Sequence, residues 1–349
     1  MGWAIRQDWL DELGLEVPVT YEDYENVLKA FKEKKGCSAP LAIPSNEILA
    51  VGYGYGLYGG GLFVDGWYQE NGETKFYFYS DREAGRKTLE TLNRWYSEGL
   101  IDPDFATGFS FGTDSVIVNN GNTGLASIIY THPNSSLKPA VDAGAKFTPL
   151  LPPVEKAGDP IKARMESQIY GASMVISADS EKKELCMRWL DYLFSEEGAL
   201  FANYGIEGET FEMVDGEPKF TDTVVHSDTY TFDEAMRYYT LGPGTPSTFY
   251  DWTREFASVP QELIDMCYVW NEATTDNLYL YATMSAEENQ EYTNIFTDLN
   301  TYVKENVISF ITGEKSLDEY DAFVDTIEQY NIGRCIELKQ AALDRFNAR

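Results

Sequence analysis

Apolar residues recur at helical spacing early in the chain. Residues 20–36 predict a helix that begins after Thr20, which forms a variant capping box with Asp23, and ends at Gly36. The segment 82–98 predicts a second helix that ends at Gly99, with Leu89, Leu92, Trp95 and Tyr96 on its inner face. A shorter helix over residues 8–15 ends near Gly14. A fourth helix is predicted over 47–61, with glycines in its last turns.

Short apolar runs between these helices predict strands. They cover residues 38–44, 122–130, 146–153 and 168–177. Residues 62–79 predict a hairpin of aromatic strands with Asn71-Gly72 at its turn, and Asp215-Gly216 marks a second hairpin.

The later part of the chain is predicted to be mainly helical. Residues 180–205 predict one long amphipathic helix with Leu185, Trp189, Leu190 and Leu193 on its inner face. From about residue 233 onward nearly every segment has a helical pattern, and Gly313 separates two helices. Strands alternating with helices, followed by helices alone, indicate an α/β fold with a helical C-terminal third.

Charge narrows the range of partners. The 349 residues contain 57 acidic and 27 basic side chains, which gives a net charge of −30. Such a surface repels nucleic acid and anionic membranes, so we expect no nucleic-acid partner. Aromatic residues make up 14% of the chain, which suits a core and also the stacking faces of a sugar site.

No residue pattern predicts a metal site, a cofactor or a catalytic triad. The four cysteines are far apart and are interpreted as buried free thiols, and there are only two histidines. The spacing of Gly54, Gly56 and Gly59 matches GxGxxG, but no strand precedes it and no helix is predicted after it. We interpret these glycines as a helix end that allows close backbone packing, and we predict no nucleotide site.

Four segments together resemble one protein family. They are WAIRQDWLDELGLEVPVTYEDYENVLKAFK (3–32), RWYSEGLIDPDF (94–105), LDYLFSEEGALFANYGIEGETFEMVDGEPKFTD (190–222) and FITGEKSLDEYDAFV (310–324). In this order they resemble the extracellular solute-binding proteins, family 1, of bacterial ABC importers. The resemblance extends over essentially the whole chain.

Two features depart from the family pattern. The segment KKGCSAP replaces an acidic, glycine-rich loop, so we predict no calcium site there. Members also begin with a lipoprotein signal and a first segment that builds most of the N-terminal lobe, and the sequence has no counterpart of either. The resemblance therefore implies a two-lobed fold of the type II periplasmic-binding-protein class with an incomplete N-terminal lobe.

The resemblance also implies how the chain is divided. Residues 1–131 would form the first part of the C-terminal lobe, and residues 132–225 would return to the N-terminal lobe. Residues 226–349 would be a helical segment packing mainly on the C-terminal lobe.

The function implied by the resemblance is that of a non-enzymatic binding protein. It would bind a carbohydrate, most naturally an oligosaccharide, in a cleft between the lobes and deliver it to ABC permease subunits in the membrane. The complete protein would be a monomer anchored outside the cytoplasm as a lipoprotein. Two alternatives stay open at this point: a secreted carbohydrate-active enzyme or carbohydrate-binding module, and a ligand sensor for a signalling partner.

Candidate ligand residues lie at strand ends and in the loops that follow them. The candidates are polar or aromatic residues and one glycine that would let the backbone approach a ligand closely: Ser45, Asn46, Tyr130, Tyr170, Gly171, Tyr250 and Trp252.

For several other residues, a structural role is favoured over ligand binding or catalysis. Tyr53 and Tyr55 suit core packing, Arg6 suits an ion pair with Asp8, and Trp3 suits the core between lobes. The pair Glu207 and Glu209 matches glycosidase carboxylates only in spacing and is interpreted as a turn, as are Asp102 and Asp104.

Overall fold

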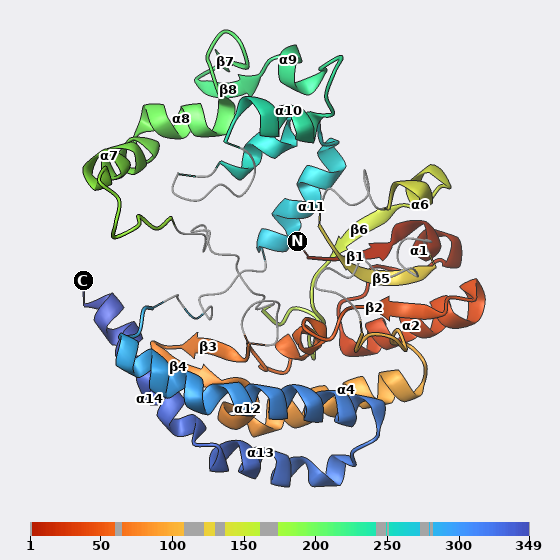
Figure 1. The fold of residues 1–349 in the computed structure, drawn as a ribbon. Coiled ribbons are helices and arrows are strands. Elements are labelled where there is room, and N and C mark those ends of the chain that lie inside the picture. Colours follow the sequence, from red (N-terminus) through yellow and green to blue (C-terminus); the bar gives the residue numbers. More distant parts are fainter. Residues whose placement is uncertain are drawn as a thin grey trace. The chain divides into compact units, whose positions relative to one another are not determined.

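The computed structural model describes residues 2–59, 65–107, 122–129, 137–160, 174–241, 249, 251–272, 279 and 282–348 (Figure 1). The chain divides into two compact units. Unit 1 comprises Met1–Met165 and Asp265–Arg349, and unit 2 comprises Glu166–Ile264. Residues 132–165 fall in unit 1 because β6 (Phe147–Leu150) pairs with β1 (Gly2–Arg6). The assignment of segments to the lobes of a binding protein stays a prediction.

Unit 1 is built around a four-stranded sheet with the order β2-β5-β1-β6. The strand β2 (Ala39–Ala42) runs parallel to β5 (Thr123–Ile128), whereas β1 is antiparallel to both of its neighbours. The strands expected over 38–44, 122–130 and 146–153 are thus confirmed with shorter bounds, and the strand expected over 168–177 lies mostly outside the described residues.

Helices pack on this sheet and on one another. α1 (Gln7–Leu13) and α2 (Tyr21–Lys35) follow β1, and both end at glycines in the left-handed conformation, as predicted. The predicted capping box at Thr20 is confirmed, since its hydroxyl accepts from the Asp23 N–H and the Asp23 carboxylate accepts from the Thr20 N–H. α6 (Lys138–Asp142) precedes β6.

A layer of long helices completes unit 1. α4 (Arg82–Ser97) packs against α12 (Ala286–Thr312), which also contacts α14 (Ile332–Asn347) (Figure 1). Unit 1 also contains η4 (Leu317–Glu319), α13 (Tyr320–Gln329) and residues 265–272 of α11 (Gln261–Glu272). Within α4 the predicted inner face is confirmed for Leu89, Leu92 and Trp95, which are fully buried, whereas Tyr96 is half-buried.

The glycine-rich stretch differs from the helix predicted over 47–61. Only a 3₁₀ helix, η1 (Ile48–Tyr53), forms there. Gly54 then makes a β-bridge with Val154, and a β-carbon on Gly54 would lie 2.1 Å from the Pro153 carbonyl oxygen. The helix stops early because two backbones meet at this point, so the predicted close backbone contact is confirmed and the predicted helix length is wrong.

The hairpin with Asn71-Gly72 is confirmed, but it is short. β3 (Trp67–Glu70) pairs with β4 (Glu73–Phe76), and both turn residues have positive φ angles, 53° and 83°. The following residues form a helical turn, α3 (Tyr77–Ser80), in which the Ser80 hydroxyl accepts from the Phe76 N–H at 2.9 Å. Strand structure therefore does not reach residue 79.

Unit 2 contains two helices in place of the single helix predicted over 180–205. α7 (Lys183–Leu193) ends before Ser195, whose hydroxyl caps α8 (Glu196–Tyr204). Of the predicted inner face only Leu193 is buried, whereas Leu185 is 62% and Trp189 50% exposed. The helix is interrupted between Leu193 and Glu196, and Gly198 lies so close to the Tyr192 carbonyl oxygen that a β-carbon would be 1.9 Å away.

The rest of unit 2 is a small hairpin with short helices. β7 (Phe211–Val214) and β8 (Glu217–Phe220) pair around the predicted Asp215-Gly216 turn. They are followed by α9 (Asp222–Val225), α10 (Phe232–Tyr239), η3 (Trp252–Ser258) and the start of α11. All four cysteines are free; three are buried as predicted, but Cys186 is partly exposed because α7 is largely uncovered.

Candidate functional site

The carboxyl ends of the parallel strands define the candidate site. β2 and β5 run in the same direction, so both end at one edge of the sheet. β1 runs the opposite way, and its first residue, Gly2, lies opposite Ile128 at the same edge. Ligands of open α/β sheets bind outside this edge. We call it the carboxyl edge.

Ser45 and Asn46 lie in the turn that leaves β2 at the carboxyl edge. The Ser45 N–H donates to the Phe105 carbonyl at 3.1 Å, and the Glu47 N–H donates to the Pro44 carbonyl at 2.9 Å. Ser45 is half-buried and Asn46 is exposed, so both side chains are within reach of a solute.

A buried polar contact joins this turn to β5. Glu47 is 5% exposed, and its carboxylate accepts a hydrogen bond from the Ser127 hydroxyl. Ser127 lies directly opposite Trp3 in the antiparallel register, so both side chains point to the same face of the sheet.

Trp270 of α11 completes the carboxyl edge. Its indole N–H donates to the Trp3 carbonyl at 2.8 Å, and its ring lies on Gly2, where a β-carbon would be 2.5 Å away. The two tryptophans and the Glu47 carboxylate are buried and support the edge from within, whereas Ser45 and Asn46 are the accessible polar groups of the turn.

Sequence reasoning missed Glu47, Ser127 and Trp270 as parts of this edge. Glu47 directly follows the predicted pair Ser45 and Asn46, so its position was an available signal. The contributions of Ser127 and Trp270 depend on the strand register and on a contact across more than 260 residues of sequence, and no local pattern reveals either. Trp3 is buried, as its interpretation as core implied.

Most of the other predicted ligand residues lie outside the described residues. These are Tyr130, Tyr170, Gly171 and Tyr250. Trp252 begins η3, but its side chain is also outside the described part. Their role in ligand binding stays a prediction.

The residues on either side of position 250 are held firmly within unit 2. The buried Asn203 side chain donates to the Phe249 carbonyl at 2.7 Å and accepts from the Asp251 N–H at 3.0 Å. The Tyr204 hydroxyl donates to the Asp251 carboxylate at 2.5 Å. The start of η3 is thereby fixed to the end of α8.

Arg6 lies at the opposite end of β1 from the carboxyl edge. Its guanidinium donates to both oxygens of Asp8, at 2.8 and 2.6 Å, and stacks 4.1 Å from the Trp9 ring centroid. The predicted structural ion pair is therefore confirmed. Burial tends to raise the pKa of Asp8, but the hydrogen bonds from Arg6 and the Lys146 N–H outweigh it and lower that pKa below 3.8.

The Asp8 carboxylate is expected to make stability depend on acidity. A carboxyl whose pKa is lower in the folded state stabilises the fold fully above its unfolded pKa, and this contribution is lost as the pH falls through the folded pKa. Asp8→Asn should therefore lower the free energy of unfolding at pH 7, and the difference from the wild type should shrink below about pH 4. Urea unfolding at several pH values tests this, with Asp142→Asn, an exposed helix pair, as the control. A pH-independent difference would contradict the expectation.

Tyr53 and Tyr55 belong to the core, as predicted. Tyr53 is 7% exposed. The Tyr55 ring stacks on Tyr21 with centroids 3.9 Å apart, and its hydroxyl lies 3.0 Å from that of Thr91.

The acidic residues that were interpreted as turns in the sequence do lie in turns. Glu207 and Glu209 are exposed on either side of Gly208, which has a φ of 80°. Asp102 is buried and accepts from the Asp104 N–H at 2.9 Å, which is the predicted turn.

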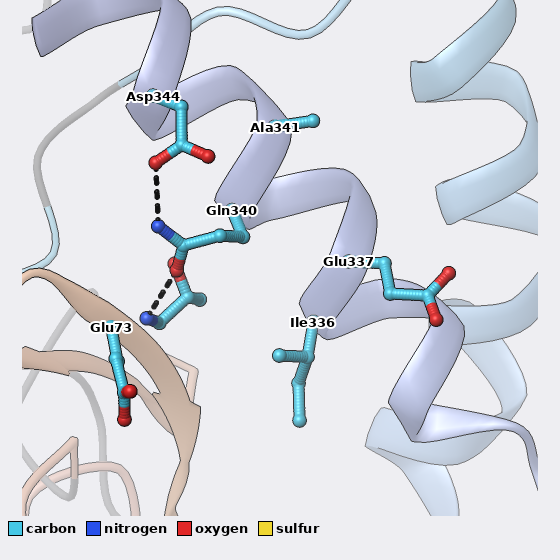
Figure 2. Close-up of a pocket in the computed structure, with 7 residues that line it drawn as sticks. Glu73, Ile336, Glu337, Gln340, Ala341 and Asp344 are labelled. Carbon is cyan, nitrogen blue, oxygen red and sulfur yellow. Dashed lines mark hydrogen bonds between the residues drawn. The ribbon is translucent and has the colours of Figure 1, made fainter.

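A separate groove of about 500 Å³ lies between β4 and α14 (Figure 2). Gln340 spans it, accepting from the Thr74 N–H at 2.6 Å and donating to Asp344 at 2.7 Å. Glu73 and Glu337 also line it. The groove includes none of the predicted ligand residues, and Gln340 is already bonded to Thr74 and Asp344, so we do not take it as the functional site.

On the neighbouring side of α14, an amine is enclosed by aromatic rings. Lys339 Nζ lies 4.9, 4.4 and 5.1 Å from the ring centroids of Trp67, Tyr279 and Tyr292. Burial lowers the pKa of Lys339 to about 8, whereas the ring faces favour its charged form. The lysine joins α14 to the β3–β4 hairpin.

Within the described ranges, no group of three or more His, Cys, Asp or Glu side chains is placed to hold a metal ion.

Comparison with known proteins identifies the family. The family model described as bacterial extracellular solute-binding protein matches residues 1–200. The chain belongs to this family. The predicted resemblance is confirmed, and the family is that of proteins that bind solutes outside the cell.

Relatives within the family include transporter components. The fructooligosaccharide ABC transporter substrate-binding protein FusA of Streptococcus pneumoniae serotype 4 is 22% identical over 367 residues, covering 100% of this chain and 66% of FusA. Lipoprotein LipO of Bacillus subtilis strain 168 is 28% identical over 243 residues, covering 61% of this chain and 44% of LipO. The chain thus spans about half to two thirds of the length of these relatives.

Solved structures of solute-binding proteins share the fold. The alginate-binding protein AlgQ2, solved without calcium ion, matches 98% of this chain and 71% of its own, with a TM-score of 0.71 and 23% identity. FusA of S. pneumoniae in complex with kestose matches 99% of this chain and 72% of its own, with a TM-score of 0.70 and 19% identity. The predicted α/β solute-binding-protein fold is confirmed. Among the described helices, none combines the length and the apolar character needed to cross a membrane.

Proposed function

We propose that this chain is the substrate-binding component of an ABC importer and that it binds an oligosaccharide. The observation that carries the proposal is the carboxyl edge of an α/β solute-binding fold, where Ser45 and Asn46 are accessible in the turn after β2 and Glu47, Trp3 and Trp270 form buried support. The match to FusA over the whole chain supports a carbohydrate as ligand.

The proposal includes both units. In the two-lobed fold that the family resemblance implies, the ligand would favour closure because each lobe contributes contacts. Tyr130, Tyr170, Gly171, Tyr250 and Trp252 are proposed ligand contacts on the same basis. Residues 132–225 and 226–349 keep their predicted lobe assignments as part of this proposal.

The partners follow from the same role. We propose that the complete protein works as a monomer, is held outside the cytoplasm by a lipid anchor, and hands its ligand to permease subunits in the membrane. No cofactor and no catalytic step belong to the proposal. Glu207→Gln would leave binding unchanged, because this carboxylate lies in an exposed turn.

A thermal-shift screen against neutral and acidic mono- and oligosaccharides tests the proposal. A ligand at about 100 times its dissociation constant adds about 2.7 kcal/mol to the free energy of unfolding. We expect at least one oligosaccharide to raise the melting temperature of the wild type and to raise that of a Ser45→Ala/Asn46→Ala variant less. No shift with any saccharide, in a protein with a cooperative unfolding transition, would contradict the proposal.

A further inference from the structure

A single side chain in unit 2 binds the residues on both sides of position 250. Asn203, the next-to-last residue of α8, is 3% exposed. Its amide nitrogen donates to the Phe249 carbonyl at 2.7 Å, and its amide oxygen accepts from the Asp251 N–H at 3.0 Å. Tyr250 is joined by peptide bonds to both of these residues. The two residues that flank Tyr250 are therefore tied to one point of α8.

The Asn203 amide suits these contacts because it carries both donors and an acceptor. Its nitrogen also donates to the Ala199 carbonyl at 2.8 Å, so its two N–H bonds go to carbonyl oxygens and its oxygen accepts an N–H. Alanine offers neither kind of group, and aspartate lacks the donors. Asn203→Ala would therefore remove this partner from the Phe249 carbonyl and from the Asp251 N–H.

Further contacts hold the start of η3 at the same point. The Tyr204 hydroxyl donates to the Asp251 carboxylate at 2.5 Å. The guanidinium of the buried Arg254 donates to the Asn203 carbonyl at 2.9 Å. Trp252, the first residue of η3, lies between these two attachments along the chain. The backbone at both predicted ligand residues of this segment is thus fixed from the end of α8.

We propose that Asn203 is a positioning residue for ligand binding, because it fixes the backbone that carries Tyr250 and Trp252. The inference rests on the proposed function and on the ligand contacts proposed for these two aromatic residues. A ring that is held in place before the ligand arrives binds it more tightly, because ordering the segment on binding would cost free energy. Asn203 is buried and acts through the backbone that it binds, without touching the ligand.

Asn203→Ala tests the inference by isothermal titration calorimetry. The probes are kestose, raffinose, maltotriose, cellotriose and an alginate trisaccharide. We expect the saccharide that binds the wild type most tightly to bind the variant at least tenfold more weakly. Amide hydrogen exchange without ligand checks the cause. The Asp251 N–H should exchange at least tenfold faster in the variant, because it has lost the acceptor that protects it.

Thr210→Val is the matched control in the same unit. Thr210 is 4% exposed, and its hydroxyl donates to the Tyr204 carbonyl at 2.6 Å and accepts from the Ile206 N–H at 2.7 Å. The substitution removes buried hydrogen bonds at the end of α8 but leaves the contacts of Asn203 in place. It should change the dissociation constant by less than twofold. An equal loss of affinity in the two variants would mean that Asn203 supports only the fold of unit 2, and it would overturn the inference.

Tyr204→Phe is a milder variant that tests the inference even if Asn203→Ala does not fold. It keeps the ring and removes the hydroxyl that holds the Asp251 carboxylate, so binding should weaken at least threefold. Wild-type affinity in Asn203→Ala, or in Tyr204→Phe where Asn203→Ala does not fold, would overturn the inference and leave the proposed function standing. Failure of every saccharide to bind the folded wild type would overturn the proposed function and the inference together.

Discussion

Replacing Gly54 with alanine is expected to lower the free energy of unfolding by about 3 kcal/mol or more. The new β-carbon would lie 2.1 Å from the Pro153 carbonyl oxygen and 2.8 Å from the Val154 α-carbon. Both are backbone atoms, so no side-chain rotation relieves the overlap. The β-bridge between Gly54 and Val154 would have to open, and with it the attachment of the segment that follows β6.

Gly333→Ala is the control for this prediction. Gly333 lies in α14 with no atom within 4 Å of the added β-carbon. Alanine favours a helix over glycine by up to about 1 kcal/mol, so this change should leave stability unchanged or raise it. Urea unfolding followed by far-ultraviolet circular dichroism measures both variants. Equal unfolding midpoints for the two would show that the close approach at Gly54 is not part of the fold.

Replacing Trp95 with alanine is expected to cost about 3–5 kcal/mol. Trp95 is fully buried on the inner face of α4, and its indole N–H donates to Glu25 at 3.1 Å. Its ring also stacks on Tyr24 with centroids 6.5 Å apart. The change therefore creates a large cavity between α4 and α2 and removes a hydrogen bond.

Trp189→Ala provides the matched comparison. Trp189 lies on α7 and is 50% exposed, so its removal should cost less than about 1 kcal/mol. Both substitutions delete the same side chain, and urea unfolding by circular dichroism ranks them. A larger loss at Trp189 than at Trp95 would mean that the face of α7 is covered and that unit 1 has a different core.

These two tryptophans show what the sequence could and could not predict. Helical spacing placed each on an inner face, and for Trp95 the prediction was right because α12 and α2 supply partners. Spacing identifies the apolar face of a helix but says nothing about whether a partner is present. At α7 the face exists, but Leu193 is the only buried residue of this described helix.

Local signals with a specific geometry were reliable. The Thr20 capping box and the turns at Asn71-Gly72 and Asp215-Gly216 depend on a few neighbouring residues and were correct. Element lengths were less reliable. The contact of Gly54 with Val154 ends η1 early, and the cap at Ser195 starts a second helix within the segment 180–205. The residues of the candidate site divide in the same way between local and long-range signals. Ser45 and Asn46 directly follow a predictable strand, whereas Ser127 and Trp270 join the carboxyl edge through register and long-range packing.

Calorimetric titration of the wild type and of Asn46→Ala with the oligosaccharide that gives the largest thermal shift tests the central claim most directly. The account predicts saturable binding at one site per chain and an affinity at least tenfold weaker in Asn46→Ala, with unchanged unfolding behaviour, because Asn46 is exposed at the carboxyl edge. Equal affinities of the two proteins, or no saturable binding by the folded wild type, would contradict it.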